Sequence, residues 1–433
     1  MTDQPRSDIA ERDPKCFDCA SIANVPDALV ADATGRLIED WDDLVASARE
    51  IIARVLAPED HGSYREGYEP QGHLNLFTNT TSALSRVLSR IDHEYQGSSP
   101  TLLTTDLEFA GCIAAIDDLW SGPVAIAQVA SAVVSDREGG DSQLHLGLVR
   151  AFNFIKPSVV FVSHVVRTTG QVLASETVRY FREANPRVII VLDGSQAVGN
   201  IAVEHDLLQY VDFYIGSGHK WLGGMPSTGF VWRRQATRWE VADPAQSLAY
   251  PGFLGGTGNA AAWKSLVRSI GDMIQDQPGS RLREIQDHNQ RLGKAFCETL
   301  GDGGDFRIVT PLLDGRPPSG LVSVAMPVPL GKAVQQQLTT NGYHATALGY
   351  EPVKWRAGAA NRCVVVCDGD WPRVGSVDKF TPARPSRAVK EFRFCFHYWH
   401  THAQVVELGC LVTEARNSGR RHGAVVASSQ TTL

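Results

Sequence analysis

The sequence contains no apolar run that approaches the roughly 18 residues needed to cross a membrane. It also lacks an excess of basic residues, because 41 Lys and Arg stand against 48 Asp and Glu and the net charge is −7. Binding to a membrane or to nucleic acid is therefore not expected. The first residues are polar and acidic and do not resemble a signal peptide, so we expect a cytoplasmic protein.

A regular cysteine spacing is absent as well. The 8 cysteines are scattered along the chain without an export signal, so we expect free thiols and no disulfide framework. Cys16 and Cys19 have a zinc-like spacing, but a second pair, Cys363 and Cys367, is spaced differently. We therefore expect no metal site.

The chain does contain a long alternation of strand-like and helix-like segments, from about residue 74 to about residue 233. Runs such as VVFVSHV and VIIVLD are rich in β-branched residues, and segments of helical character such as SETVRYFREA lie between them. Continuous apolar runs indicate strands that are covered on both faces, and strand–helix alternation indicates a mostly parallel sheet. The sequence therefore predicts an α/β fold.

Further units are predicted around this sheet. Apolar residues at helical spacing predict an amphipathic helix between Leu37 and Val55, and a second helical region runs from about 258 to 300. After Gly301 the pattern becomes that of a smaller α+β domain. The predicted units are an N-terminal arm (1–33) that packs with the small domain, a large domain (34–300), a small C-terminal domain (301–415) and a flexible tail (416–433).

Residues with functional side chains follow several of the predicted strands. Ligands of parallel sheets bind at the carboxyl ends of the strands, so these residues form the candidate site. They are Asp193 and Gln196 after VIIVLD, Ser217, His219 and Lys220 after FYIG, Glu108 and Phe109 after LTTD, Arg167 after VVFVSHV, and Asn79 to Ser82 after LNLF. The last group precedes a helix, where hydroxyls and free N–H groups favour an anion such as phosphate. The alternative for that group is a simple N-cap by Thr80 or Thr81.

The segment GSGHKWLGG, residues 216–224, does not fit a phosphate-binding Walker loop, because Lys220 follows His219 and precedes Trp221. A lysine, a carboxylate, an aromatic ring and a hydroxyl cluster together suit pyridoxal phosphate. The lysine forms a Schiff base, the carboxylate keeps the pyridine nitrogen protonated, the ring stacks on the cofactor and the hydroxyls hold its phosphate. The glycines of the segment are expected to let the backbone pass close to the cofactor ring.

Asp193-Gly194-Ser195-Gln196 together with Ser217-Gly218-His219-Lys220 resembles the class V aminotransferase family of fold-type I pyridoxal phosphate enzymes. The stretch TNTTSALSRVL is most similar to the isopenicillin N epimerase-like branch, which also contains cysteine C–S lyases, including enzymes of lincosamide antibiotic pathways. The resemblance covers about residues 35 to 300 and extends more loosely over the C-terminal domain. It implies a mostly parallel seven-stranded sheet with a smaller α+β C-terminal domain.

The resemblance also implies a role for each residue of the candidate site. Lys220 would hold the cofactor covalently and move protons, Asp193 would pair with the pyridine nitrogen, and Phe109 would stack on the ring. Gln196 would hydrogen-bond the phenolic oxygen. The phosphate would be held by Thr81, Ser82, Ser217 and His219 and by Gly256 and Thr257 of a neighbouring subunit, which implies a homodimer with shared active sites. His219 has packing as an alternative role, and Glu108 is expected to be a structural hydrogen-bonding group.

Two arginines are expected to contact the substrate. Arg393 matches the arginine that clamps a substrate carboxylate, a bidentate role suited to its planar fork; the alternative is a surface charge on an edge strand. Arg167 stands where cysteine desulfurases commonly have asparagine beside the cofactor. An extra cation there is expected to bind a second anionic or polar group of the substrate or to tune the cofactor oxygen; the alternative is an ordinary salt bridge. The arm around Asn24 and the stretch from about 343 to 390 are expected to select the substrate side chain.

Departures from the family pattern bear on the reaction. Phe109 replaces the histidine of cysteine desulfurases, and neither Cys363 nor Cys367 matches their nucleophile loop before Arg393, so a desulfurase is disfavoured. With Lys220 the only clear base, we expect β-elimination by a C–S lyase of a cysteine S-conjugate, in specialised antibiotic-type metabolism. Transamination, epimerisation and decarboxylation-coupled oxidative deamination of a similar amino acid conjugate stay open, because all begin with the same adduct. The intact set of Lys220, Asp193 and Arg393 disfavours a catalytically inactive regulatory protein.

Overall fold

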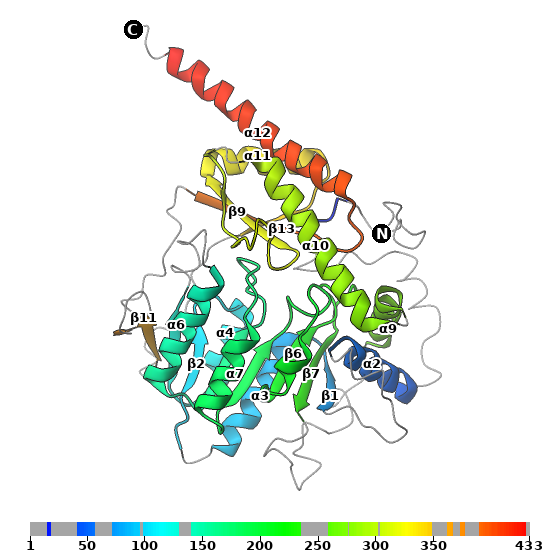
Figure 1. The fold of residues 1–433 in the computed structure, drawn as a ribbon, viewed down its shortest axis with the longest axis vertical. Coiled ribbons are helices and arrows are strands. Elements are labelled where there is room, and N and C mark those ends of the chain that lie inside the picture. Colours follow the sequence, from blue (N-terminus) through cyan, green and yellow to red (C-terminus); the bar gives the residue numbers. More distant parts are fainter. Residues whose placement is uncertain are drawn as a thin grey trace.

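The computed structural model describes most of the chain and consists of two sheets with their covering helices (Figure 1). The described residues are 15–18, 41–56, 72–95, 98–129, 140–234, 259–275, 277–301, 304–348, 362–366, 373–376 and 389–429. Among them, no helix combines the length and the apolar character needed to span a membrane.

The large sheet has nine strands in the order β1-β7-β6-β5-β4-β2-β3-β11-β12. The strands from β6 to β11 in this order run parallel, whereas β7 pairs antiparallel with both β1 and β6, and β12 pairs antiparallel with β11. Their bounds are β1 (Gly72–Phe77), β2 (Leu102–Thr105), β3 (Val124–Gln128), β4 (Val159–Ser163), β5 (Ile189–Asp193), β6 (Phe213–Ser217), β7 (Gly229–Arg234), β11 (Arg362–Val366) and β12 (Arg373–Ser376). The predicted α/β class is confirmed.

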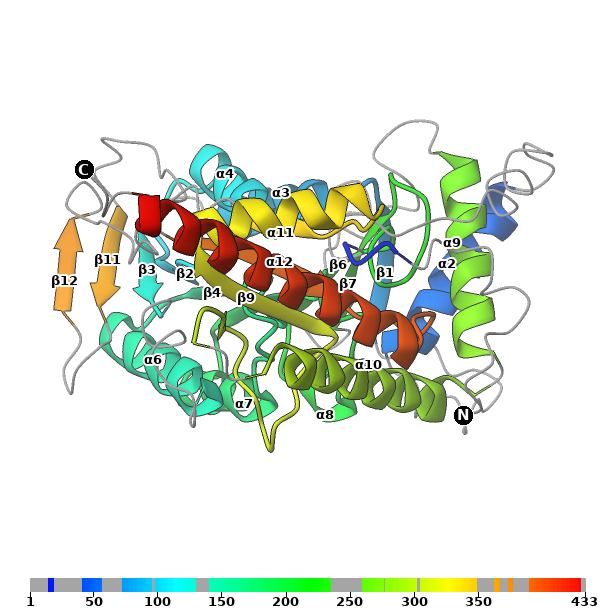
Figure 2. The same ribbon diagram turned by 90° about the horizontal axis from the view of Figure 1, so that it is seen from above.

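Helices cover both faces of the large sheet. Figure 2 shows α3 (Thr80–Glu94) and α4 (Ala110–Leu119) on one side, and α6 (Gly140–Ile155), α7 (Ser175–Ala184) and α8 (His205–Leu208) on the other. Alternate residues of each central strand enter different apolar cores: Val159 and Phe161 of β4 pack under α3 and α4, whereas Val160 and Val162 pack on the opposite face. Burial on both faces explains the continuous apolar runs, and helices α2 (Trp41–Leu56) and α9 (Ala260–Ile274) complete the second core.

A smaller antiparallel sheet, in the order β10-β13-β9-β8, carries its own core. It comprises β8 (Arg307–Ile308), β9 (Leu321–Pro327), β10 (Thr346–Leu348) and β13 (Val389–Cys395), with α10 (Pro278–Leu300), α11 (Val328–Thr340) and α12 (His402–Ser429) packed beside it. The N-terminal residues 15–18 lie against this sheet, because the amide of Cys395 donates to the carbonyl of Phe17 at 3.0 Å. The fold thus brings the first described segment of the chain next to β13.

Two features differ from the sequence-based expectations. The large sheet gains β11 and β12 beyond the seven expected strands, from a region assigned to the C-terminal domain. Arg362 fixes this addition, because its buried guanidinium pairs with Asp117 of α4 at 3.3 Å and donates to the carbonyl of Gly122 at 2.9 Å. In addition, α12 continues to Ser429, although a flexible tail was expected from residue 416; extending a formed helix is easier than starting one.

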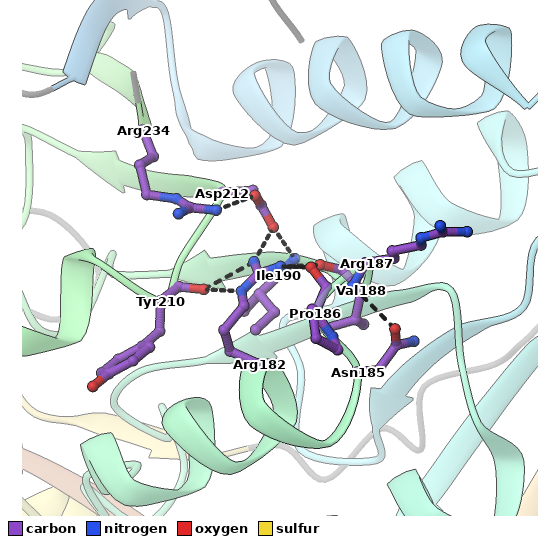
Figure 3. Close-up of polar contacts among 9 residues, drawn as sticks. All are labelled: Arg182, Asn185, Pro186, Arg187, Val188, Ile190, Tyr210, Asp212 and Arg234. Carbon is purple, nitrogen blue, oxygen red and sulfur yellow. Dashed lines mark hydrogen bonds and ion pairs between the residues drawn. The ribbon is translucent and has the colours of Figure 1, made fainter. Parts of the chain in front are cut away.

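Figure 3 shows a buried cluster of polar contacts around Asp212, at the amino ends of β5 and β6. The opposite, carboxyl ends of these strands carry Asp193 and Ser217. Asp212 accepts from Arg182 at 2.5 Å, from Arg234 at 3.0 Å and from the amide of Ile190 at 2.9 Å. Arg182 also donates to the carbonyls of Val188 and Tyr210. Because every charge here has a partner, the cluster fixes the start of two neighbouring strands without a buried unpaired charge.

Candidate active site

A cavity of about 370 Å³ lies where the parallel strands of the large sheet end. Its walls come from the loops after β1, β2, β4, β5 and β6 and from β13 of the small sheet. The lining residues are Asn79, Thr80, Thr81, Phe109, Cys112, Arg167, Asp193, Ser195, Gln196, Ser217, His219, Lys220 and Arg393. Most of the residues predicted from the sequence are therefore brought together by the fold.

The amino end of α3 forms one corner of the cavity. Thr80 and Thr81 open the helix, and the Thr80 hydroxyl shares a hydrogen bond of 2.7 Å with the Ser195 hydroxyl. The backbone of β7 comes close behind them, since a Cβ on Gly229 would lie 2.6 Å from the Cα of Asn79. Helix N–H groups, hydroxyls and the nearby Ser217 and His219 side chains suit a phosphate group.

Ser82 takes a different place from the predicted one. Asn79 is the N-cap of α3, and its side chain accepts from the Ser82 amide at 2.8 Å while the Ser82 hydroxyl accepts from the Asn79 amide at 3.2 Å. Ser82 does not line the cavity. This capping box occupies its polar groups, so the geometry supports Thr80 and Thr81 as phosphate ligands and gives Ser82 a role in helix capping. The alternative prediction, an N-cap by Thr80 or Thr81, was also wrong, because the N-cap is Asn79.

Asp193 lies at the carboxyl end of β5, with only 6% of its surface exposed. One carboxylate oxygen accepts from the Ser195 amide at 2.8 Å, and the other lies 3.7 Å from the thiol of Cys112, which donates to it. Burial, together with the charges of Asp193 and Glu108, raises the pKa of the Cys112 thiol well above its ordinary value, so this thiol remains protonated. Two donors therefore orient the carboxylate, and sequence reasoning identified neither of them.

Lys220 and Phe109 face each other across the cavity. The Lys220 ammonium lies 5.9 Å from the centroid of the Phe109 ring, and Phe109 is 43% exposed although it is a large apolar side chain. Burial lowers the pKa of Lys220, Asp193 partly opposes this shift, and the charges of Arg393 and Arg167 add to it. A lowered pKa increases the fraction of neutral amine, which is the nucleophilic and basic form.

Trp221 and His397 pack behind Gln196 and Lys220 and hold them in place. The Gln196 carbonyl accepts from the indole N–H of fully buried Trp221 at 2.9 Å, so its NH₂ end is the group that can donate to a ligand oxygen. His397 stacks on Trp221 and, because its Nδ1 accepts from the Tyr398 amide, its Nε2 donates to the Trp221 carbonyl at 2.7 Å. His397 thus fixes the residue next to Lys220.

The glycines around Lys220 serve packing inside the protein. A Cβ on Gly218 or Gly224 would approach the Leu266 side chain of α9 to within 2.6 Å and 2.8 Å. The prediction that these glycines admit the cofactor ring was therefore wrong at these two positions, since their close contacts are with a helix behind the loop.

Arg393, on β13 of the small sheet, and Arg167, in the loop after β4, lie next to each other in the wall of the cavity. Arg393 is 1% exposed, donates to the Arg167 carbonyl at 3.4 Å and forms an ion pair of 3.2 Å with Asp18. The alternative prediction of a surface charge for Arg393 was wrong. The guanidinium of Arg167 lies 5.5 Å from the centroid of the Phe109 ring, within reach of a cation–π interaction.

Glu108 is buried behind the cavity and is held by hydrogen bonds, as expected. It accepts from the Thr105 hydroxyl at 2.7 Å and from the Ser163 hydroxyl at 2.5 Å. Burial raises the pKa of Glu108 to about 7, and the nearby charge of Asp193 adds to this effect against the opposing hydrogen bonds.

Pyridoxal phosphate fits this arrangement, judged by the donor set alone. An anion site at a helix terminus, an oriented carboxylate, a ring and a lysine of lowered pKa surround one cavity. Asn24, Gly256 and Thr257 lie outside the described residues, so their predicted contacts stay predictions.

The sequence profile of the family described as Aminotransferase class-V matches residues 76–349. The chain is 28% identical over 307 residues to the isopenicillin N epimerase of Streptomyces clavuligerus, covering 61% of this chain and 68% of that protein. It is 43% identical over 74 residues to the isopenicillin N epimerase of Amycolatopsis lactamdurans, covering 17% of this chain and 18% of that protein.

Similar solved structures share the fold. A NifS-like protein superimposes with a TM-score of 0.65 at 17% identity, over 93% of this chain and 99% of its own. A cysteine desulfurase from Thermococcus onnurineus NA1 gives a TM-score of 0.65 at 16% identity, over 96% of this chain and 99% of its own. These structures confirm the predicted fold-type I architecture. The predicted pyridoxal phosphate cofactor is confirmed by the family match over residues 76–349.

The two hydroxyls of the α3 corner give a matched test of the phosphate site. Thr81→Val should weaken pyridoxal phosphate binding by roughly tenfold or more, because a hydrogen bond to a charged group is lost. Ser82→Ala should leave the affinity within about twofold and lower the free energy of unfolding by roughly 0.5–1 kcal/mol, because only a cap contact is lost. Equilibrium dialysis and urea unfolding measure the two effects. If Ser82→Ala weakened cofactor binding and Thr81→Val did not, Ser82 would be the phosphate ligand, as predicted from the sequence.

The raised pKa of Glu108 predicts a pH dependence of stability. An acid whose pKa is raised by folding stabilises the protein below its ordinary pKa of 4.5, and this contribution is lost as the pH rises to about 7. Glu108→Gln keeps the shape and has no charge to lose. The free energy of unfolding of the variant, relative to the wild type, should therefore increase by roughly 2–3 kcal/mol between pH 5 and pH 8. Urea unfolding measures this difference. A difference in unfolding free energy between variant and wild type that stays constant from pH 5 to pH 8 would show that Glu108 is ionised throughout and would contradict the prediction.

Proposed function

The chain belongs to the class V aminotransferase family, and on that premise we propose that this pyridoxal-phosphate-dependent enzyme eliminates a thiol from a cysteine S-conjugate. The single observation that supports elimination is that Lys220 is the one good base among the described residues that line the cavity. The Cys112 thiol has a raised pKa and is bound to Asp193. The His219 ring contacts the Ser217 hydroxyl and the Thr228 carbonyl, and it belongs to the group proposed to hold the phosphate. A reaction that moves the α-proton with one base suits this site.

The chain's residues would orient the cofactor as follows. Asp193, itself held by Ser195 and Cys112, would face the pyridine nitrogen, and Phe109 would cover the ring. Thr80 and Thr81, with Ser217 and His219, would take the phosphate. When bound, pyridoxal phosphate supplies an electron sink for negative charge at the α-carbon of an amino acid.

The substrate would lie between Lys220 and the two arginines. Arg393, with Arg167 beside it, would bind the carboxylate through its planar fork, which fixes the α-carbon relative to Lys220. The Lys220 Nζ would take the proton from the α-carbon, and the bond from the β-carbon to sulfur would break with its electron pair on sulfur. After hydrolysis the products are a thiol, pyruvate and ammonia.

Epimerisation is a second candidate, because the chain is similar to two isopenicillin N epimerases. Inversion of the α-carbon would ordinarily use a proton donor on the face opposite Lys220. Next to the Phe109 ring the structure places the Arg167 guanidinium and the Lys220 ammonium, and an arginine stays protonated at neutral pH and does not donate a proton readily. Elimination, which uses one base, therefore suits the described residues of the cavity better than epimerisation does.

A cysteine desulfurase is disfavoured for this chain. Its expected nucleophile is a cysteine near the substrate, whereas Cys363 lies on β11, between β3 and the edge strand β12, and does not line the cavity. The other candidate, Cys367, is outside the described residues. The likeness to NifS-like and desulfurase structures thus concerns the fold.

We also keep the homodimer with shared active sites as part of the proposal. Its support is the sequence likeness of Gly256-Thr257 to a loop that reaches a neighbouring subunit. Sedimentation of the cofactor-loaded enzyme tests it, and a monomer that binds the cofactor fully would contradict it.

The reaction is tested with S-methyl-L-cysteine, or another S-alkyl cysteine, in D₂O. Elimination predicts methanethiol and pyruvate in equal amounts, and Lys220→Ala should yield neither. Unconsumed substrate should keep its L configuration. A D-enriched, α-deuterated substrate without released thiol would favour epimerisation and reject the lyase, and an aldehyde with CO₂ would reject both.

A further inference from the structure

Arg393 already has a carboxylate partner that belongs to the chain itself. Asp18 pairs with its guanidinium at 3.2 Å, and Thr346 hydrogen-bonds Asp18 and lies 3.4 Å from the same guanidinium nitrogen. The Arg393 side chain is 2% exposed, whereas that of Asp18 is 29% exposed. Asp18 thus reaches, from the more open side, the group that is proposed to take the substrate carboxylate.

The segment that carries Asp18 is firmly held. The Phe17 amide donates to the His344 carbonyl at 2.8 Å, and fully buried Phe17 stacks on His400 with 4.2 Å between the ring centroids. Burial lowers the pKa of His400 to about 3, so its ring is neutral and donates to the Cys16 carbonyl at 3.1 Å. The backbone next to Asp18 is therefore fixed, and the Asp18 side chain is the more exposed member of its ion pair with Arg393.

A guanidinium as buried as that of Arg393 is costly without an anion, because its charge is taken out of water. We propose that Asp18 is a specificity-determining residue, the resting counter-ion of Arg393, which a substrate carboxylate replaces on binding. The proposal rests on the proposed function, in which Arg393 is the carboxylate site. Binding then exchanges one carboxylate for another, while Arg393 keeps a charged partner throughout.

The exchange has a consequence for specificity. A ligand with a carboxylate can displace Asp18 and leave the buried charge compensated, whereas a neutral amide has no charge to offer in return. The site would therefore select amino acids over their amides. The affinity for the carboxylate is lower than it would be without Asp18, because Asp18 must first leave Arg393.

Propionate, a carboxylate without an amino group, is the probe. Cofactor-loaded enzyme is titrated calorimetrically with propionate at constant ionic strength, and propionamide serves as the neutral comparison. Asp18→Asn removes the competing charge at nearly constant volume, so propionate should bind roughly three- to tenfold more tightly. Lys15→Gln, on the same segment but away from Arg393, should leave propionate affinity unchanged. Asp18→Ser serves if the first variant does not fold.

Two further results separate the possible failures. Weaker or unchanged propionate binding by Asp18→Asn, with binding lost in Arg393→Gln, would overturn the exchange and leave Asp18 as a support for Arg393. Propionate binding by Arg393→Gln at the wild-type affinity would instead remove the carboxylate site from Arg393, and the proposed substrate orientation would fail with it.

Discussion

The parallel pairing of β5 with β6 is the constraint on which the rest of the site depends. Asp193 is the register partner of Ile215, so the carboxylate that ends β5 and the loop that carries Lys220 leave the sheet at the same edge. The ion cluster around Asp212 fixes the opposite ends of the same two strands. An acid and a lysine are thereby held in one cavity by backbone hydrogen bonds, with their distance set by the sheet.

The sequence was most informative where structure is local. The seven strands from β1 to β7 were recognisable, because burial on both faces requires continuous apolar runs. α4 was not predicted, because its sequence AGCIAAIDDL consists largely of small and apolar residues without a clear helical face. β11 and β12 were missed since their place depends on the contact of Arg362 with Asp117, far away along the chain.

The same division holds for the site. Lys220, Asp193, Phe109 and the two arginines could be found because each follows a strand or matches a motif, and all of them line the cavity. The partners that orient them could not, because each contact joins distant segments. Cys112 meets Asp193 within the large-sheet unit, Asp18 meets Arg393 at the small sheet, and His397 meets Trp221 between the two units, so each contact forms only when the tertiary structure does. Ser82 shows the converse case, in which a motif position serves local capping.

The central claim is that Lys220 binds the cofactor covalently opposite Asp193. Borohydride reduction of the enzyme loaded with pyridoxal phosphate, followed by peptide mass mapping, tests it most directly. The account predicts one phosphopyridoxyl group per chain, on Lys220, and no label in Lys220→Ala. A label on another lysine, or full labelling of Lys220→Ala, would contradict the account.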